Sequence, residues 1–101
     1  MPEAVAVATN PAVFVFAMHG CGACEEYLPR FKELAGPYRR VIPIGIYDVQ
    51  QDTKAAHFGD KLGVKATPTT IVMDKQGRLK RFVGALGNAA IKELLKQAAD
   101  Q

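Results

Sequence analysis

Several features that would point to a particular class of protein are missing from this sequence. No apolar run approaches the ~20 residues needed to cross a bilayer, so we expect no membrane-spanning segment. The net charge of +3 is too small to indicate a nucleic-acid-binding protein. The first residues carry Glu3 and no positive charge ahead of their apolar stretch, which disfavours a secretory signal and makes the cytoplasm the expected compartment. Repeats, low-complexity tracts and linkers are also missing, so we expect residues 1–101 to form a single domain.

What remains is an ordinary globular composition. The 101 residues are 49% hydrophobic and 23% charged, enough to bury a core and to exclude a disordered chain. Four basic residues do gather late in the chain. We interpret them as a charged turn and edge strand that resists aggregation between sheets. They are Lys75, Arg78, Lys80 and Arg81.

Apolar periodicity predicts four strands and three helices after an ambiguous start. The first ten residues alternate like a strand, but Pro2-Glu3 favours a short helix there. Pro29 should kink the first main helix, and Pro43 should place its strand at a sheet edge or bulge. The predicted strands cover 12–18, 41–47, 70–74 and 79–83; the predicted helices cover 22–35, the segment from Asp52 or Thr53 to Gly63, and a segment capped by Asn88.

This order of elements defines the fold class. A strand–helix–strand unit needs a right-handed crossover and a parallel strand pair, whereas the last two strands form an antiparallel hairpin. The sequence therefore predicts an α/β fold, with a mixed four-stranded sheet and helices on both faces.

The only two cysteines, Cys21 and Cys24, stand where the first strand gives way to a helix. Free backbone N–H groups and the helix dipole favour a thiolate at that position. Two cysteines three residues apart can also form a disulfide with each other. A site that exchanges two electrons with a partner disulfide requires this ability. Half of a zinc site is an alternative, but structural zinc needs four ligands and only His19 and His57 remain as typical partners. Two small buried apolar residues are a further alternative.

Other motifs at the expected separations make the sequence resemble thioredoxin. The motif "CGAC" stands where that family has Cys-Gly-Pro-Cys, and Pro29 matches a proline in the family's helix. The stretch "LGVKATPTTIVMDKQGRLKRFVGAL", residues 62–86, resembles the family's second half, with "TPT" and "VGAL" in place. The resemblance covers roughly residues 12–99.

The resemblance implies a thioredoxin-like fold and a substrate groove beside the cysteines. It implies a cis Thr67–Pro68 bond, with the Thr67 backbone pairing with an extended substrate chain. We expect Cys21 to be partly exposed and to attack, and Cys24 to be buried and to resolve. His19 and Glu25 are candidate proton relays. The expected groove is lined by Gly20, Gly22, Ala23, Thr67, Pro68, Val83, Gly84 and Ala85.

Four residues depart from the family pattern. Gly20 replaces a tryptophan, and Ala23 replaces the proline between the cysteines, which leaves that turn less rigid. Val15 replaces a buried aspartate that is thought to move a proton for the second cysteine, and Ile46 replaces the accompanying lysine. The family's first strand is also missing.

The resemblance therefore implies a thiol–disulfide oxidoreductase that reduces protein disulfides and is recharged by a separate reductase. We expect a monomer that needs no metal or organic cofactor and binds neither nucleic acid nor membrane. Two rivals stay open: a disulfide oxidant or isomerase, and a thioredoxin-fold binding subunit of a protein assembly.

Overall fold

The computed structural model describes residues 11–100 and contains the predicted α/β architecture. The first ten residues, for which a short helix was expected, lie outside the described part. The elements in chain order are β1 (Ala12–Ala17), α2 (Gly22–Ala35), the 3-10 helix η1 (Gly36–Tyr38), β2 (Ile44–Asp48), α3 (Thr53–Lys61), β3 (Thr69–Met73), β4 (Leu79–Val83) and α4 (Asn88–Ala99).

The four strands form one mixed sheet in the order β2-β1-β3-β4. β1 is central and pairs with β2 in parallel and with β3 in antiparallel, and β3 and β4 form the expected hairpin. All six residues of β1 are buried, as a strand covered on both faces requires. The chain therefore leaves for α2 from the end of an interior strand of the sheet.

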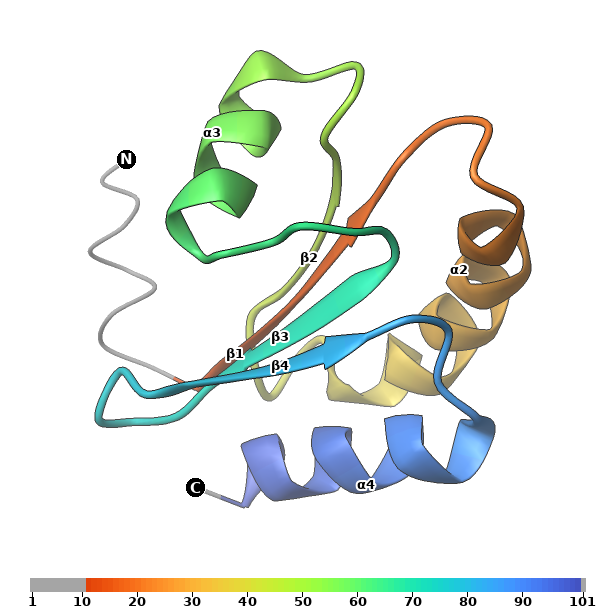
Figure 1. Ribbon diagram of the computed structural model, residues 1–101. Coiled ribbons are helices and arrows are strands. Elements are labelled where there is room, and N and C mark those ends of the chain that lie inside the picture. The colour runs from red at the N-terminus through yellow and green to blue at the C-terminus, as the bar shows by residue number, and fades with distance from the viewer. Residues whose placement is uncertain (1–10, 101) are drawn as a thin grey trace.

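Helices cover both faces of the sheet (Figure 1). α2 and α4 pack on one face around a core that includes Val13, Val15 and Phe31. α3 packs on the other face, where the rings of Phe14, Phe16, Tyr47 and Phe58 cluster with centroids 5.2–6.0 Å apart. Alternation along β1 explains this division, since successive side chains of a strand point to opposite faces.

Three strands have limits that differ from the predicted ones, and in β2 backbone hydrogen bonding explains the difference. The strand predicted over 41–47 begins only at Ile44, because Val41 and Ile42 donate their N–H groups to Tyr38 in a turn and Pro43 has none to donate. β2 is an edge strand, as Pro43 indicated. β1 ends at Ala17, one residue before the predicted limit, and β3 begins and ends one residue earlier than predicted.

The helices follow their predicted limits more closely. α2 covers 22–35 and continues through Pro29, and the Asp52 carboxylate caps α3 by accepting from the N–H of Lys54 at 2.9 Å. The predicted cap of the last helix is wrong: Gly87 is the N-cap residue, with no side-chain cap. The amide oxygen of Asn88 instead accepts a hydrogen bond from Arg30.

Candidate active site

The junction of β1 and α2 presents the cysteine pair. Gly20 has φ +81°, a left-handed conformation that turns the chain out of β1 and that other residues rarely adopt. Cys21 then serves as the N-cap residue of α2, and its Sγ accepts the N–H of Cys24 at 3.2 Å. The helix start thus supplies a backbone donor to Cys21, as a stabilised thiolate requires.

Cys21 and Cys24 are joined by a disulfide, with Cα atoms 5.2 Å apart. Cys21 is partly exposed, whereas Cys24 is only 1% exposed because it lies one turn into the helix and faces the sheet. Both burial predictions are therefore confirmed. The accessible sulfur is the one at the helix N-terminus.

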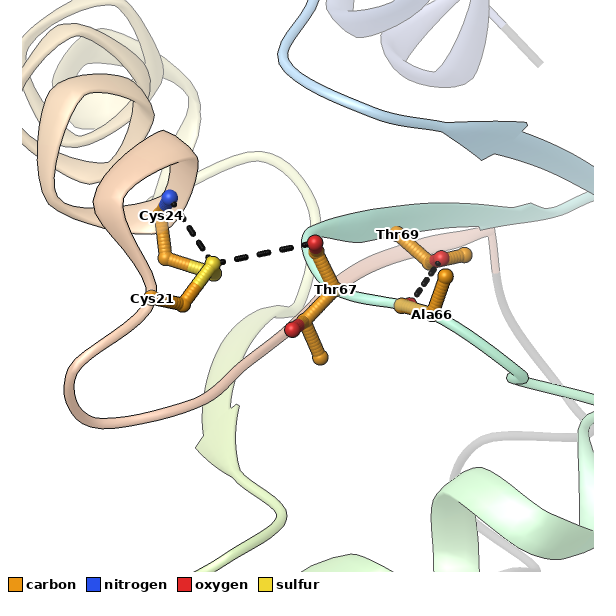
Figure 2. Close-up of a disulfide and its surroundings, with 5 residues drawn as sticks. All are labelled: Cys21, Cys24, Ala66, Thr67 and Thr69. Carbon is orange, nitrogen blue, oxygen red and sulfur yellow. Dashed lines mark hydrogen bonds between the residues drawn. A yellow bond between two sulfur atoms is a disulfide. The ribbon is translucent and has the colours of Figure 1, made fainter.

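The loop before β3 lies directly against the pair (Figure 2). The Thr67–Pro68 peptide bond is cis, and Cys21 Sγ lies 3.7 Å from the carbonyl oxygen of Thr67. A Cys21 thiol can donate to this oxygen after reduction. The hydroxyl of Thr69 donates to the Ala66 carbonyl at 2.6 Å and closes the loop on itself.

The segment after β4 forms the next wall. The N–H of Gly84 donates to the carbonyl of Pro68 at 2.8 Å, which holds this segment beside the cis-proline loop. Val83 is 69% exposed and Ala85 is also exposed, so small uncharged side chains face solvent here. Gly20, Gly22 and Ala23 are exposed beside the cysteines. The structure therefore brings the predicted groove residues together as two adjoining pairs: Thr67 with Cys21, and Gly84 with Pro68.

The two candidate proton relays stand apart from this arrangement. His19 and Glu25 are both exposed, and within residues 11–100 neither side chain makes a hydrogen bond or ion pair. The structure does not place either side chain against a sulfur, so their role stays a prediction.

An apolar pair occupies the positions where the family resemblance implies an acid and a lysine. Val15 is fully buried and pairs with Ile46 across the parallel β1–β2 ladder. Both belong to the core under α2. Neither side chain can carry a charge, so neither can accept a proton.

Sequence reasoning missed a buried polar contact near the pair. The hydroxyls of Tyr27 and Thr70 are 2.8 Å apart, and both residues are fully buried. Burial raises the pKa of the Tyr27 phenol, and the hydrogen bond with Thr70 offsets part of that increase. The periodicity placed Tyr27 on the apolar face of its helix. A phenol on such a face usually has a hydrogen-bond partner, and this was the available signal.

A second missed residue is Arg30. Its guanidinium binds the Glu26 carboxylate with two hydrogen bonds, of 2.6 and 2.9 Å, which lowers the pKa of that carboxyl. It also donates to Asn88 at 2.7 Å and lies 5.7 Å from the centroid of the Tyr27 ring. Only the pair with Glu26, four residues away on the same helix, could have been expected from spacing.

Two further findings concern the whole of the described chain. Within residues 11–100, no group of three or more His, Cys, Asp or Glu side chains is arranged to hold a metal ion. Over the same range, none of the helices has the length and apolar character of a membrane span.

The chain resembles known proteins along almost its whole length. The family model described as a thioredoxin-like domain matches residues 2–99. A thioredoxin of Borreliella burgdorferi is 30% identical over 87 residues, which covers 86% of this chain and 72% of that protein. A thioredoxin of Mycolicibacterium smegmatis is 30% identical over 90 residues, covering 89% and 80%.

Solved structures show the same fold. The structure of Fasciola hepatica thioredoxin aligns with a TM-score of 0.75 at 22% identity, over 96% of this chain and 89% of that one. Chloroplastic thioredoxin z gives a TM-score of 0.75 at 20% identity, over 99% and 88%.

Proposed function

Because this chain belongs to the thioredoxin-like family and carries a disulfide-forming cysteine pair, it is a thiol–disulfide oxidoreductase, and we propose that it reduces protein disulfides through Cys21 and Cys24. The observation that carries this proposal is the Cys21–Cys24 disulfide at the start of α2, with Cys21 accessible and next to Thr67. Cys21 is accessible to a partner protein, whereas Cys24 is buried in the protein.

The reaction proceeds in two exchanges that conserve atoms and electrons. In the reduced protein, the Cys21 thiolate attacks one sulfur of a partner disulfide; the partner's S–S bond breaks, and its second sulfur leaves as a thiolate that takes up a proton. Cys24 then loses its proton and attacks Cys21 Sγ. The mixed disulfide breaks, and the partner leaves as a dithiol. Two electrons pass from the cysteine pair to the partner, and the pair ends as the disulfide seen in the structure.

The walls of the groove supply substrate contacts in this proposal. The backbone of Thr67 pairs with an extended segment of the partner, as in strand addition. Pro68 shapes the loop, and the segment from Val83 to Ala85 forms the opposite lip. Their position beside Cys21 and their small, uncharged side chains support backbone recognition over side-chain recognition.

The setting of the protein follows from the same chemistry. We propose that a separate reductase returns two electrons to the Cys21–Cys24 disulfide, and that the protein works in the cytoplasm, where thiols are kept reduced. One copy of the chain holds both cysteines and the loops around them, which supports a monomer built as a single domain. The reaction itself needs no metal or organic cofactor.

Trapping tests the roles of the two cysteines. A Cys24→Ser variant keeps the attacking thiol but cannot release its partner, so mixed disulfides with proteins should accumulate. The matched Cys21→Ser variant should trap nothing, since its remaining thiol is buried. Equal trapping by both variants would show that the assignment of attacker and resolver is wrong. Addition of a chelator in the same experiment tests for zinc, because stoichiometric metal release would indicate a metal site instead.

The direction of exchange is tested by equilibrium with a glutathione buffer. We expect a potential between roughly −270 and −180 mV, the range from thioredoxins to protein disulfide isomerases. A more positive potential would favour the alternative function of a disulfide oxidant. In cells, a Cys21→Ser, Cys24→Ser double variant that keeps full function would favour a binding subunit.

A further inference from the structure

Two contacts on α2 connect the cysteine pair to both other parts of the groove, and the two-exchange mechanism makes no use of them. The first is the bond between Tyr27 and Thr70, 2.8 Å long and fully buried. Tyr27 lies one helical turn after Cys24, and Thr70 lies two residues after Pro68. The bond therefore joins the helix that carries the cysteines to the strand that leads out of the cis-proline loop.

The second contact joins the same helix to the start of α4, just after the opposite lip. Arg30 donates to the amide oxygen of Asn88 at 2.7 Å, across 58 residues of sequence. Asn88 is the first residue of α4 and follows directly on the loop 84–87. The two-bond pair with Glu26 fixes the guanidinium of Arg30, whose face lies over the ring of Tyr27. Arg30 therefore takes part in the contact with Asn88 and also packs on Tyr27, which makes the first contact.

A third link closes the arrangement. The N–H of Gly84 donates to the carbonyl of Pro68, so the lip is bonded to the cis-proline loop as well. The helix α2, the strand after the cis-proline loop and the start of α4 after the lip are therefore linked by hydrogen bonds, and the lip is bonded to the cis-proline loop. Exposed small residues make up much of the lip and the helix start, and they offer little packing of their own to fix the distances between these parts.

We propose that Tyr27 and Arg30 are positioning residues that set the width of the substrate groove relative to Cys21. The proposal rests on the proposed function. An extended peptide must contact both loops and Cys21 together, so its rate of reduction depends on their spacing. A small disulfide needs only the Cys21 sulfur, so its rate should not depend on that spacing.

The experiment compares two substrates, with dithiothreitol as the electron source. One is a short peptide closed by a disulfide, and the other is hydroxyethyl disulfide. Arg30→Gln and Asn88→Ala should each lower the second-order rate constant for the peptide about three- to tenfold and leave that for hydroxyethyl disulfide unchanged. Asn88→Asp keeps an acceptor for Arg30 and should restore the peptide rate. Tyr27→Phe should act in the same direction as Arg30→Gln.

Matched controls separate this effect from general weakening of the fold. Arg78 also binds a carboxylate four residues away, Asp74 at 2.9 Å, but at the turn between β3 and β4. Tyr47 is a partly buried tyrosine on the opposite face of the sheet. Arg78→Gln and Tyr47→Phe should leave both rate constants unchanged.

The outcomes distinguish the two proposals. If the unmodified protein leaves the peptide oxidised, the proposed function fails and the positioning role fails with it. If the unmodified protein reduces the peptide, but Asn88→Ala does so equally well while correctly folded, the positioning role alone is refuted. An equal decrease of the rate constants for both substrates also refutes the positioning role, because the substitution then affects the reactivity of the cysteines themselves.

Discussion

Placing a carboxyl at Val15 tests whether the apolar strand under α2 limits release of the partner. Val15 is fully buried on the face of β1 that α2 covers, and Cys24 is buried on the side of α2 that faces the sheet. Burial in apolar surroundings raises the pKa of a thiol by disfavouring its charged form. Cys24 must be a thiolate to resolve the mixed disulfide. Resolution should therefore be slow near neutral pH and rise about tenfold per pH unit below the thiol's pKa.

Val15→Asp should change both rate and stability. Burial also raises the pKa of the introduced carboxyl, which then accepts the Cys24 proton near neutral pH; a positioned base contributes about 10²–10⁴-fold. Loss of the buried valine costs about 1.5–3 kcal/mol, and an unpartnered buried polar group about 1–3 kcal/mol more. The carboxyl is neutral in both states at acidic pH, so the loss should be smallest there and grow as pH rises above about 4.

The assay is stopped-flow release of a labelled peptide from its mixed disulfide with Cys21 across pH. Val13→Asp is the matched control, because Val13 is also fully buried on the same face of β1 but lies two residues further from the cysteines. It should lose similar stability, measured by urea unfolding, without faster release. If the parent already resolves rapidly at neutral pH and Val15→Asp brings no gain, another group moves the proton, and His19 is the next to test.

Two further predictions concern charge near the pair. Glu25→Ala should lower the pKa of the Cys21 thiol, because a nearby negative charge disfavours the thiolate; thiolate absorbance against pH measures it, and an unchanged pKa would mean that the carboxylate points away into solvent. Burial raises the pKa of Tyr27, so its contribution to folding is complete below the ordinary phenol value of about 10 and is lost as pH rises through the folded value. Urea unfolding should therefore show a steeper alkaline loss of stability in the parent than in Tyr27→Phe. That variant should also cost about 1–3 kcal/mol at neutral pH, since it leaves the buried hydroxyl of Thr70 without its partner; parallel alkaline curves would contradict the assignment.

Local sequence signals predicted the elements and the placement of the cysteines. Helix periodicity predicted α2 over residues 22–35, its observed range, and two strand-like runs around a short turn predicted the β3–β4 hairpin. Cys21 falls at the helix start, because the apolar strand and the first amphipathic turn meet there. The family resemblance then implied the cis Thr67–Pro68 bond, which the structure contains.

Two predictions made from local sequence were wrong because other hydrogen bonds involve the same residues. The run "VIPIGIY" has the composition of a strand, yet its first residues close a turn on Tyr38 and the strand begins at Ile44. Asn88 has the side chain of a helix cap, but Arg30 binds its amide oxygen and Gly87 takes the N-cap position.

The sequence by itself determined which residues are buried, where the reactive sulfur sits on its helix, and which family the chain resembles. Burial and the helix start follow from the periodicity of neighbouring residues, and the resemblance follows from the spacing of motifs along the chain. Only the tertiary structure decided what faces the sulfur and what holds the groove together. Thr67 reaches Cys21 across 46 residues, Thr70 reaches Tyr27 across 43, and Asn88 reaches Arg30 across 58. Periodicity tells which face of a helix is covered but carries no record of the side chain opposite, because that partner is set by the crossing of strands and helices in space.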